Sequence, residues 1–144
     1  MKLSRRDLSM LLPALAASSA PGQQKQSSPL PSRVYHDKQI PYEGNQQKKG
    51  RRFFFGSNRS GFNLEMHETI LGVGTETHPP HQHVHEEVLV VVEGTVEVLC
   101  DGKTEQAEAG SVVYFASNQM HGARNAGRVP CRYYVMELRG DNAG

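Results

Sequence analysis

Residues 78–87 read HPPHQHVHEE, so four histidines and two glutamates stand within ten positions. Imidazole and carboxylate groups bind divalent transition metals, and this density predicts a metal site. Successive side chains of a strand point to opposite faces, so residues of one parity share a face. Shared parity selects four candidate ligands, His81, His83, His85 and Glu87. The alternative interpretation is a solvated histidine-rich loop.

His78 and Glu86 have the opposite parity and fall outside that set. Pro79 and Pro80 also interrupt any strand after His78, which predicts a turn at that position. Parity does not separate His85 from the other three candidates.

Short strands must position these groups. From Arg51 onward the chain alternates strand-like runs with turn residues, and no later stretch has a helical apolar period. The runs are RRFFFG, FNLEMHETILGVG, VLVVVEG, TVEVLCDG, SVVYFA and CRYYVMELR. DGK at 101–103 and EGT at 93–95 are typical of hairpin turns. The pattern predicts an all-β sandwich or barrel.

A second segment supplies a distant histidine. GSVVYFASNQMHGARN, residues 110–125, passes from a strand through a polar turn to His121. The two segments resemble the two motifs of the cupin family. His-x-His, three residues, Glu, six residues and Gly are matched by His81, His83, Glu87 and Gly94.

The second motif is matched by Gly110, His121 and Asn125. Ala116 and Asn118 stand where the motif has proline and glycine. Asparagine tolerates the left-handed backbone that glycine would supply, so the turn is expected to form.

The resemblance implies a single-domain cupin jelly-roll barrel over residues 51–140. The metal ligands that it implies are His81, His83, Glu87 and His121. The family's pattern also implies a bend that lifts His85 out of the site and leaves Glu86 pointing outward. We expect Asn125 to be a plausible partner for a ligand's second ring nitrogen.

Three imidazoles and one carboxylate suit a divalent transition metal, with Mn or Fe expected and Ni, Co, Zn or Cu as alternatives. Open coordination positions favour an enzyme acting on a small organic molecule, with a dioxygenase-like oxidoreductase as the leading hypothesis. Glu87 could add an acid or base role. The alternatives are a metal-dependent isomerase or decarboxylase, and a non-catalytic periplasmic cupin that binds metal or a small ligand.

Other polar residues give weaker signals. His67 shares parity with Glu65, opposite Leu64 and Met66, and is predicted on a wet face. Met120 and Arg124 flank His121 and are candidates to touch a substrate. Strand tyrosines are expected to pack in the core, and one of them is a candidate to line the pocket. Cys100 and Cys131 are expected to be free thiols.

The first 20 residues, with Arg5-Arg6 and a short apolar run, resemble a twin-arginine export signal. That implies a periplasmic or extracellular protein without a membrane anchor. Twin-arginine export carries folded proteins, so the metal would be loaded in the cytoplasm. Outside the cytoplasm, copper and zinc would bind in place of Mn or Fe because their affinity is higher. Loading in the cytoplasm avoids this competition, so Mn or Fe is expected. A disordered N-terminus is the alternative.

Residues 21–50 are rich in Gln, Ser, Pro and Lys and are predicted to form a disordered linker or arm, and residues 141–144 a frayed end. Without the first 20 residues, Lys and Arg fall from 16 to 13 and Asp and Glu from 15 to 14, giving a net charge of −1. No basic surface for nucleic acid is expected. The family likeness implies a homodimer.

Overall fold

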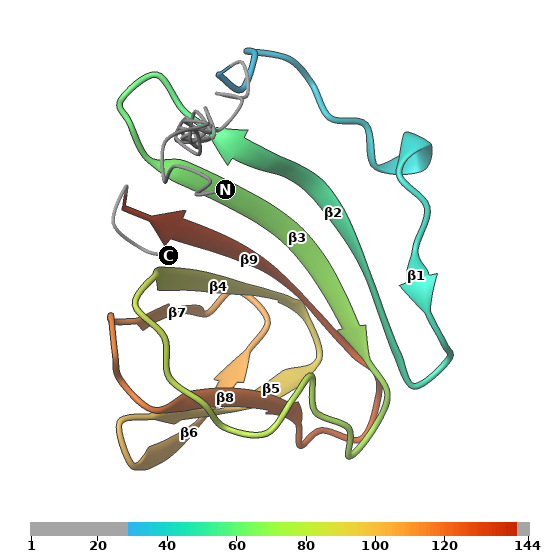
Figure 1. Ribbon diagram of the computed structural model, residues 1–144. Coiled ribbons are helices and arrows are strands. Elements are labelled where there is room, and N and C mark those ends of the chain that lie inside the picture. The colour runs from blue at the N-terminus through green and yellow to red at the C-terminus, as the bar shows by residue number, and fades with distance from the viewer. Residues whose placement is uncertain (1–28, 141–144) are drawn as a thin grey trace, which may run out of the picture.

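A computed structural model describes residues 29–140 as two antiparallel β-sheets that face each other (Figure 1). The predicted export signal of residues 1–20 and the predicted frayed end of residues 141–144 lie outside the described residues. The strands are β1 (Glu43–Gly44), β2 (Lys48–Ser57), β3 (Asn63–Leu71), β4 (Glu86–Glu93), β5 (Thr95–Cys100), β6 (Lys103–Glu108), β7 (Val112–Phe115), β8 (His121–Asn125) and β9 (Cys131–Arg139). The predicted all-β class is confirmed.

The larger sheet has the order β1-β2-β3-β9-β4-β7, and the smaller sheet has the order β6-β5-β8. Their inner faces enclose a core of ten buried residues, Leu71, Leu89, Val91, Val96, Val98, Ala107, Phe115, Cys131, Tyr133 and Val135. Cys100 and Cys131 are free thiols, as expected. No helix among residues 29–140 is long and apolar enough to cross a bilayer.

The turns position the strands largely as predicted. Asp101 and Gly102 have positive φ angles of 47° and 82° and close the β5–β6 hairpin. Asn118 adopts the left-handed conformation, with φ of 59°, which confirms its expected role as a glycine substitute. The turn at Gly94 differs from its prediction, because it joins β4 to β5 in different sheets and forms no hairpin.

Residues 29–50 differ from the predicted disordered arm. Leu30 donates a backbone hydrogen bond to the Ser57 carbonyl, a 3-10 turn (η1) spans Asp37–Gln39, and β1 pairs with β2. The Tyr35 ring lies 5.2 Å from that of Phe54. The arm is polar, and it is held because β2 offers both an edge and aromatic side chains to it.

Glu68 fixes the arm to the sheet. Its side chain is fully buried and accepts hydrogen bonds from Arg51, from Tyr42 at 2.9 Å and from Arg132 at 3.0 Å. Burial by itself would raise the pKa of Glu68, but the hydrogen bonds from Arg132, Arg51 and Tyr42 outweigh it and lower the pKa below its ordinary value. A buried carboxylate with three donors is therefore kept ionised.

We expect Glu68→Gln to lower the free energy of unfolding by about 3 kcal/mol, because it leaves Arg51 buried without its counter-charge. Glu108→Gln, at an exposed position on β6, is the matched control and should change stability little. Urea denaturation measures both variants.

The difference between wild type and Glu68→Gln should also depend on pH. The folded-state pKa of Glu68 is lowered, so its stabilisation is present above the pKa of the unfolded chain and is lost as pH falls through the folded value. A difference that grows on acidification would contradict the network.

Candidate metal centre

Two backbone hydrogen bonds bring the histidine-rich loop against β8. His81 donates to the His121 carbonyl at 2.9 Å, and His121 donates to the His81 carbonyl at 2.8 Å. This isolated bridge lies outside the sheets and ties the loop between β3 and β4 to the first residue of β8. Residues 40 positions apart in the sequence thus become neighbours.

The bridge gathers all three predicted histidine ligands. His81, His83 and His121 each offer a ring nitrogen, and these nitrogens lie within 4.8 Å of one another. Glu87, from the start of β4, places Oε1 3.0 Å from His83 Nε2 and Oε2 3.9 Å from His121 Nε2. Glu87 therefore lies beside two of the three histidines, and it groups within 4.8 Å with His83 and His85 rather than with all three.

Three ring nitrogens of this group are buried without a hydrogen-bond partner: His81 Nδ1, His83 Nε2 and His121 Nε2. Buried polar atoms are almost always paired, because an unpaired one costs about 1–3 kcal/mol. Three of them converging on one point fit a cation that accepts their lone pairs.

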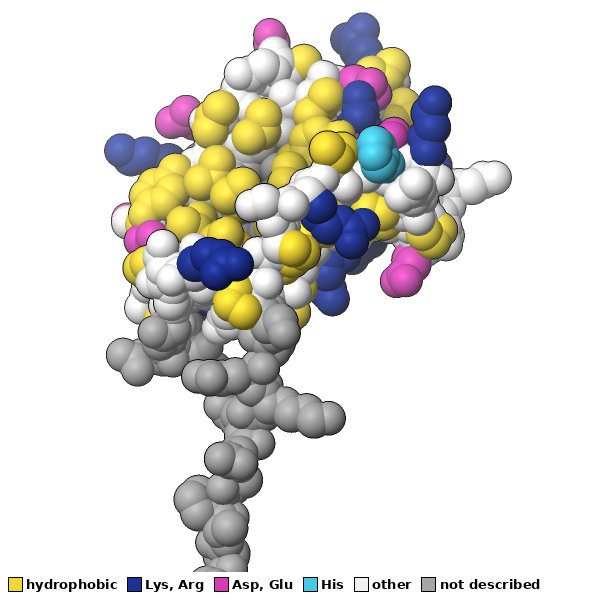
Figure 2. Space-filling model, turned by 90° about the horizontal axis from the view of Figure 1, so that it is seen from above, with side chains coloured by type: hydrophobic (Ala, Val, Ile, Leu, Met, Phe, Trp, Pro, Cys, Tyr) yellow, Lys and Arg dark blue, Asp and Glu magenta, His cyan; other side chains and the backbone are white. Residues whose placement is uncertain are grey.

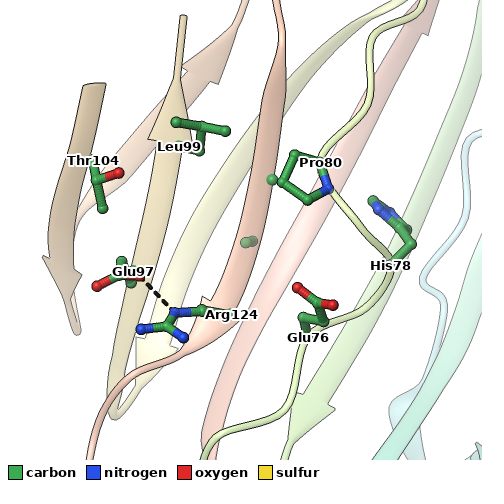
Figure 3. Close-up of a pocket in the computed structure, with 9 residues that line it drawn as sticks. Glu76, His78, Pro80, Glu97, Leu99, Thr104 and Arg124 are labelled. Atoms are coloured by element: carbon green, nitrogen blue, oxygen red, sulfur yellow. Dashed lines mark hydrogen bonds and ion pairs between the residues drawn. The ribbon is translucent and has the colours of Figure 1, made fainter. Parts of the chain in front are cut away.

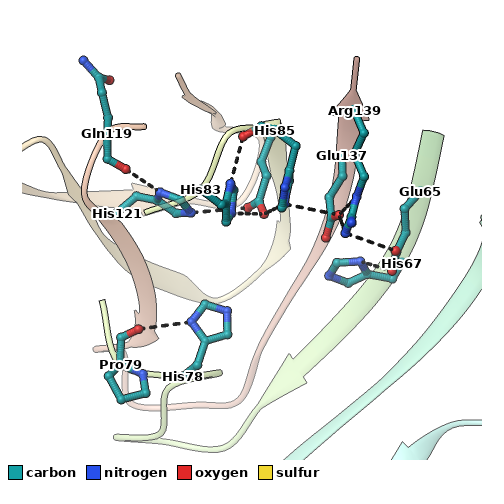
Figure 4. A network of polar contacts seen from close by, with 11 residues as sticks. Glu65, His67, His78, Pro79, His83, His85, Gln119, His121, Glu137 and Arg139 are labelled. Atoms are coloured by element: carbon teal, nitrogen blue, oxygen red, sulfur yellow. Dashed lines mark hydrogen bonds and ion pairs between the residues drawn. The ribbon is translucent and has the colours of Figure 1, made fainter. Parts of the chain in front are cut away.

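The opposite ring nitrogens are fixed by backbone carbonyls. His83 Nδ1 lies 2.9 Å from the His85 carbonyl, and His121 Nδ1 lies 2.8 Å from that of Gln119 (Figure 4). A carbonyl can only accept, so these contacts place the proton on Nδ1 and leave the Nε2 lone pair free. Such support is typical of metal-bound histidine.

The electrostatics around His81 favour its neutral imidazole. Burial lowers the pKa of His81, and the neighbouring His78, His121 and His83 lower it further. The neutral ring is the form that binds a metal.

His85 lies closer to the group than predicted. Its ring stacks on that of His83 with centroids 3.4 Å apart, and its Nε2 lies 3.4 Å from both Glu87 Oε1 and Glu137 Oε2. The expected bend does not lift it away, because residues 82–85 form a loop and β4 begins only at Glu86. Strand parity therefore does not govern this run, and His83, His85 and Glu87 form a second possible triad.

Three further expectations concern residues around the loop. His78 is exposed in the predicted turn, yet its ring centroid lies 4.2 Å from that of His81. Glu86 points outward as predicted, where its hydrogen bond raises the pKa of the Tyr114 hydroxyl. Asn125 contacts no ligand, since its side chain binds the backbone of Leu71, Gly127 and Val129 instead.

The prediction that His67 faces water is wrong. His67 is half-buried and lines a cavity of about 70 Å³ together with the ligands Glu87 and His121. Tyr133 also lines this cavity, as expected for one of the strand tyrosines, and burial raises its pKa strongly. The available sequence signal is the shared parity of Glu65, His67 and Thr69, which places them on one face of β3. In the structure that face points into the interior.

Arg124 and Met120 do not reach this cavity. Arg124 pairs with Glu97 and lines a separate groove of about 280 Å³, between the small sheet and residues 76–80 (Figure 3). Met120 is exposed. Neither residue lines the cavity beside the four candidate ligands.

Comparisons with known proteins agree with the fold. Residues 67–137 match the family model described as a cupin domain. Similar solved structures include an RmlC-like cupin from Shewanella frigidimarina, with 21% identity, a TM-score of 0.62, and coverage of 74% of this chain and 90% of that one. KdgF from Halomonas sp. has 18% identity and a TM-score of 0.62, covering 76% of this chain and 98% of that one.

The polyketide cyclase RemF from Streptomyces resistomycificus is similar at 20% identity and a TM-score of 0.60, covering 77% of this chain and 85% of that one. Identities this low show the fold alone, and that fold is the cupin jelly roll. No curated protein matches the chain.

Substitutions separate the ligands from their supports. We expect His81→Ala and His121→Ala each to weaken metal binding by more than 100-fold, because each removes a direct donor. His85→Ala should weaken it only about tenfold, as removal of a supporting group does. Competition titration with a chelator measures the affinities.

His36→Ala, in the exposed arm, is the control and should bind as wild type does. A larger loss in His85→Ala than in His81→Ala would favour the triad of His83, His85 and Glu87 instead.

Proposed function

We propose that this protein, whose residues 67–137 match a cupin domain, binds one divalent transition metal and acts on a small organic molecule. The proposed ligands are His81, His83, Glu87 and His121. The observation that carries the proposal is the convergence of three buried, unpartnered imidazole nitrogens beside a carboxylate. Mn or Fe is the proposed native ion, with Ni, Co, Zn and Cu as outcomes of the test.

The net charge of the proposed metal site determines which kind of small molecule it favours. Three neutral imidazoles, one carboxylate and a divalent ion carry a net charge of +1, which favours an anionic or enolate-like group. Four protein donors leave positions free on an octahedral ion. The metal would supply Lewis-acid chemistry and a template for two ligands side by side.

The chain supplies the surroundings. Leu89, Phe115 and Val135 are buried and form the apolar part of the cavity wall, which limits the access of water. Glu87 contributes both oxygens to the site, so one can bind the metal while the other accepts a proton from a bound molecule. A small cavity beside open metal positions suits a small substrate.

A dioxygenase-like oxidoreductase is the reaction that we put first. The cupin fold by itself selects no reaction. Among similar structures, one is described as a predicted oxalate decarboxylase and another as the cupin domain of a transcriptional regulator. Metal-dependent isomerisation or decarboxylation and non-catalytic binding are therefore the alternatives that the experiment below must separate.

Export and assembly complete the proposal. The first 20 residues would direct the folded, metal-loaded chain to the periplasm through the twin-arginine route. The proposed homodimer would bury apolar side chains that the outer sheet face exposes, namely Val90, Val112, Tyr114, Met136 and Leu138. Hydrophobic side chains gather on the face seen in Figure 2.

Metal analysis of protein purified after expression should find Mn or Fe at close to one ion per chain. That protein should consume dioxygen with at least one member of a panel of diols, flavonols and keto acids, and His83→Ala should remove both the metal and the activity. An oxygen electrode and product analysis are the measurements.

The outcomes separate the alternatives. Turnover without dioxygen uptake would indicate an isomerase or decarboxylase. Full occupancy by zinc with no turnover of any panel member would contradict the oxygenase hypothesis and favour a binding protein.

A further inference from the structure

The cavity beside the metal centre has two unlike polar walls. Glu87 and His121, both proposed ligands, lie on one side, and His67 and Glu137 lie on strands β3 and β9 (Figure 4). The proposed function uses only the first wall. The second wall is polar where the inner face of a β-barrel is ordinarily apolar, so its groups require an explanation.

His67 carries an unsatisfied donor or acceptor in this second wall. Its Nδ1 is buried and has no hydrogen-bond partner. The nearest carboxylate oxygen, Glu65 Oε1, lies 3.5 Å away without forming a hydrogen bond. Since an unpaired buried nitrogen is costly, a bound molecule that pairs with it would gain affinity.

The carboxylates around His67 already have their cations. Glu65, Glu137 and Glu87 are register partners in a row across β3, β9 and β4, so three like charges lie side by side. Arg139 Nη2 lies 2.5 Å from Glu137 Oε2 and 3.9 Å from Glu65 Oε2, and Arg52 Nε lies 2.9 Å from Glu65 Oε1. The two guanidinium groups thus neutralise the carboxylates beside His67.

This arrangement restricts what can lie against His67. An anionic group would meet Glu65 and Glu137, and a cationic group would compete with Arg139. A neutral hydroxyl can both donate and accept, so it can pair with Nδ1 or with a carboxylate oxygen without cost in charge.

We propose that His67 is a substrate-positioning residue and that the cavity selects a small molecule with metal-chelating oxygens at one end and a neutral hydroxyl at the other. The inference rests on the proposed metal centre and adds the substrate class. A volume of about 70 Å³ admits only a few non-hydrogen atoms beyond the chelating group, since one water needs roughly 10–15 Å³ of the same measure. The reacting part is therefore about three carbons long.

Three acids that differ only at the far end test this selection on the cobalt-loaded protein. Glycolate has the chelating hydroxyl and carboxylate alone, glycerate adds a hydroxymethyl group, and tartronate adds a second carboxylate. Each acid is titrated while the visible absorption of cobalt is followed, so no enzyme activity is needed. Wild type should bind glycerate about tenfold more tightly than glycolate, and tartronate more weakly than glycolate.

Substitutions at His67 assign the preference to its side chain. His67→Phe should bind glycolate as wild type does and lose the tenfold preference for glycerate. His67→Asn, which keeps a hydrogen-bonding atom near the Nδ1 position, should restore part of it. His36→Phe, the same change in the exposed arm, should leave all three affinities unchanged.

Cobalt stoichiometry is measured for each protein first, and it separates the two proposals. A wild type that takes up no cobalt contradicts the metal centre, and this inference with it. A cobalt-loaded wild type that binds glycolate and glycerate equally, or binds neither, overturns the inference alone. So does a His67→Phe variant that loads cobalt and keeps the tenfold preference.

Discussion

The pair of backbone hydrogen bonds between His81 and His121 is the contact on which the site depends. The loop after β3 contains Pro79 and Pro80, forms no strand of its own and is carried to β8 by this bridge. Further backbone hydrogen bonds hold the same loop, from Asn118 to the His83 carbonyl at 2.7 Å and between Thr75 and Asn125 at 2.8 Å. The bridge places the nitrogens of His81 and His83 beside that of His121, where a shared cation could satisfy all three.

A second constraint acts from the opposite side of the interior. Strands β3, β9 and β4 align three glutamates in register, and only Glu87 belongs to the proposed metal centre. Like charges directly opposite each other destabilise a sheet, and arginine pairs on Glu65 and Glu137 offset this. On the outer face of the same sheet, Glu68 pairs with Arg51 and Arg132 and holds the arm by accepting a hydrogen bond from Tyr42. The sheet is thus stabilised by paired charges on both faces, and its inner face carries the polar groups on which the proposed role of His67 rests.

The alternation of side chains and the spacing of turns were enough to predict most strands and the all-β class. They failed for β6 and β8, whose residues are mostly polar and whose positions at the edges of the small sheet permit this. The three candidate histidines lie together, with Glu87 beside His83 and His121, although parity, the first argument for them, does not apply to residues 82–85. Spacing along the chain carries no information on how a loop folds back. The sequence therefore predicts His85 farther from the candidate ligands than the structure places it. The sequence predicts His67 on a solvent-exposed face because the residues that share its parity are polar. It does not show that the opposite sheet covers that face.

The position of the bound ion would show which nitrogens hold it. Diffraction from crystals of the cobalt-loaded protein, recorded at the cobalt absorption edge, locates the metal directly. The account predicts one anomalous peak per chain, within bonding distance of His81, His83, His121 and Glu87. A peak between His85 and Glu87 with His81 and His121 unliganded, or a peak at Glu65, His67 and Glu137, would contradict it.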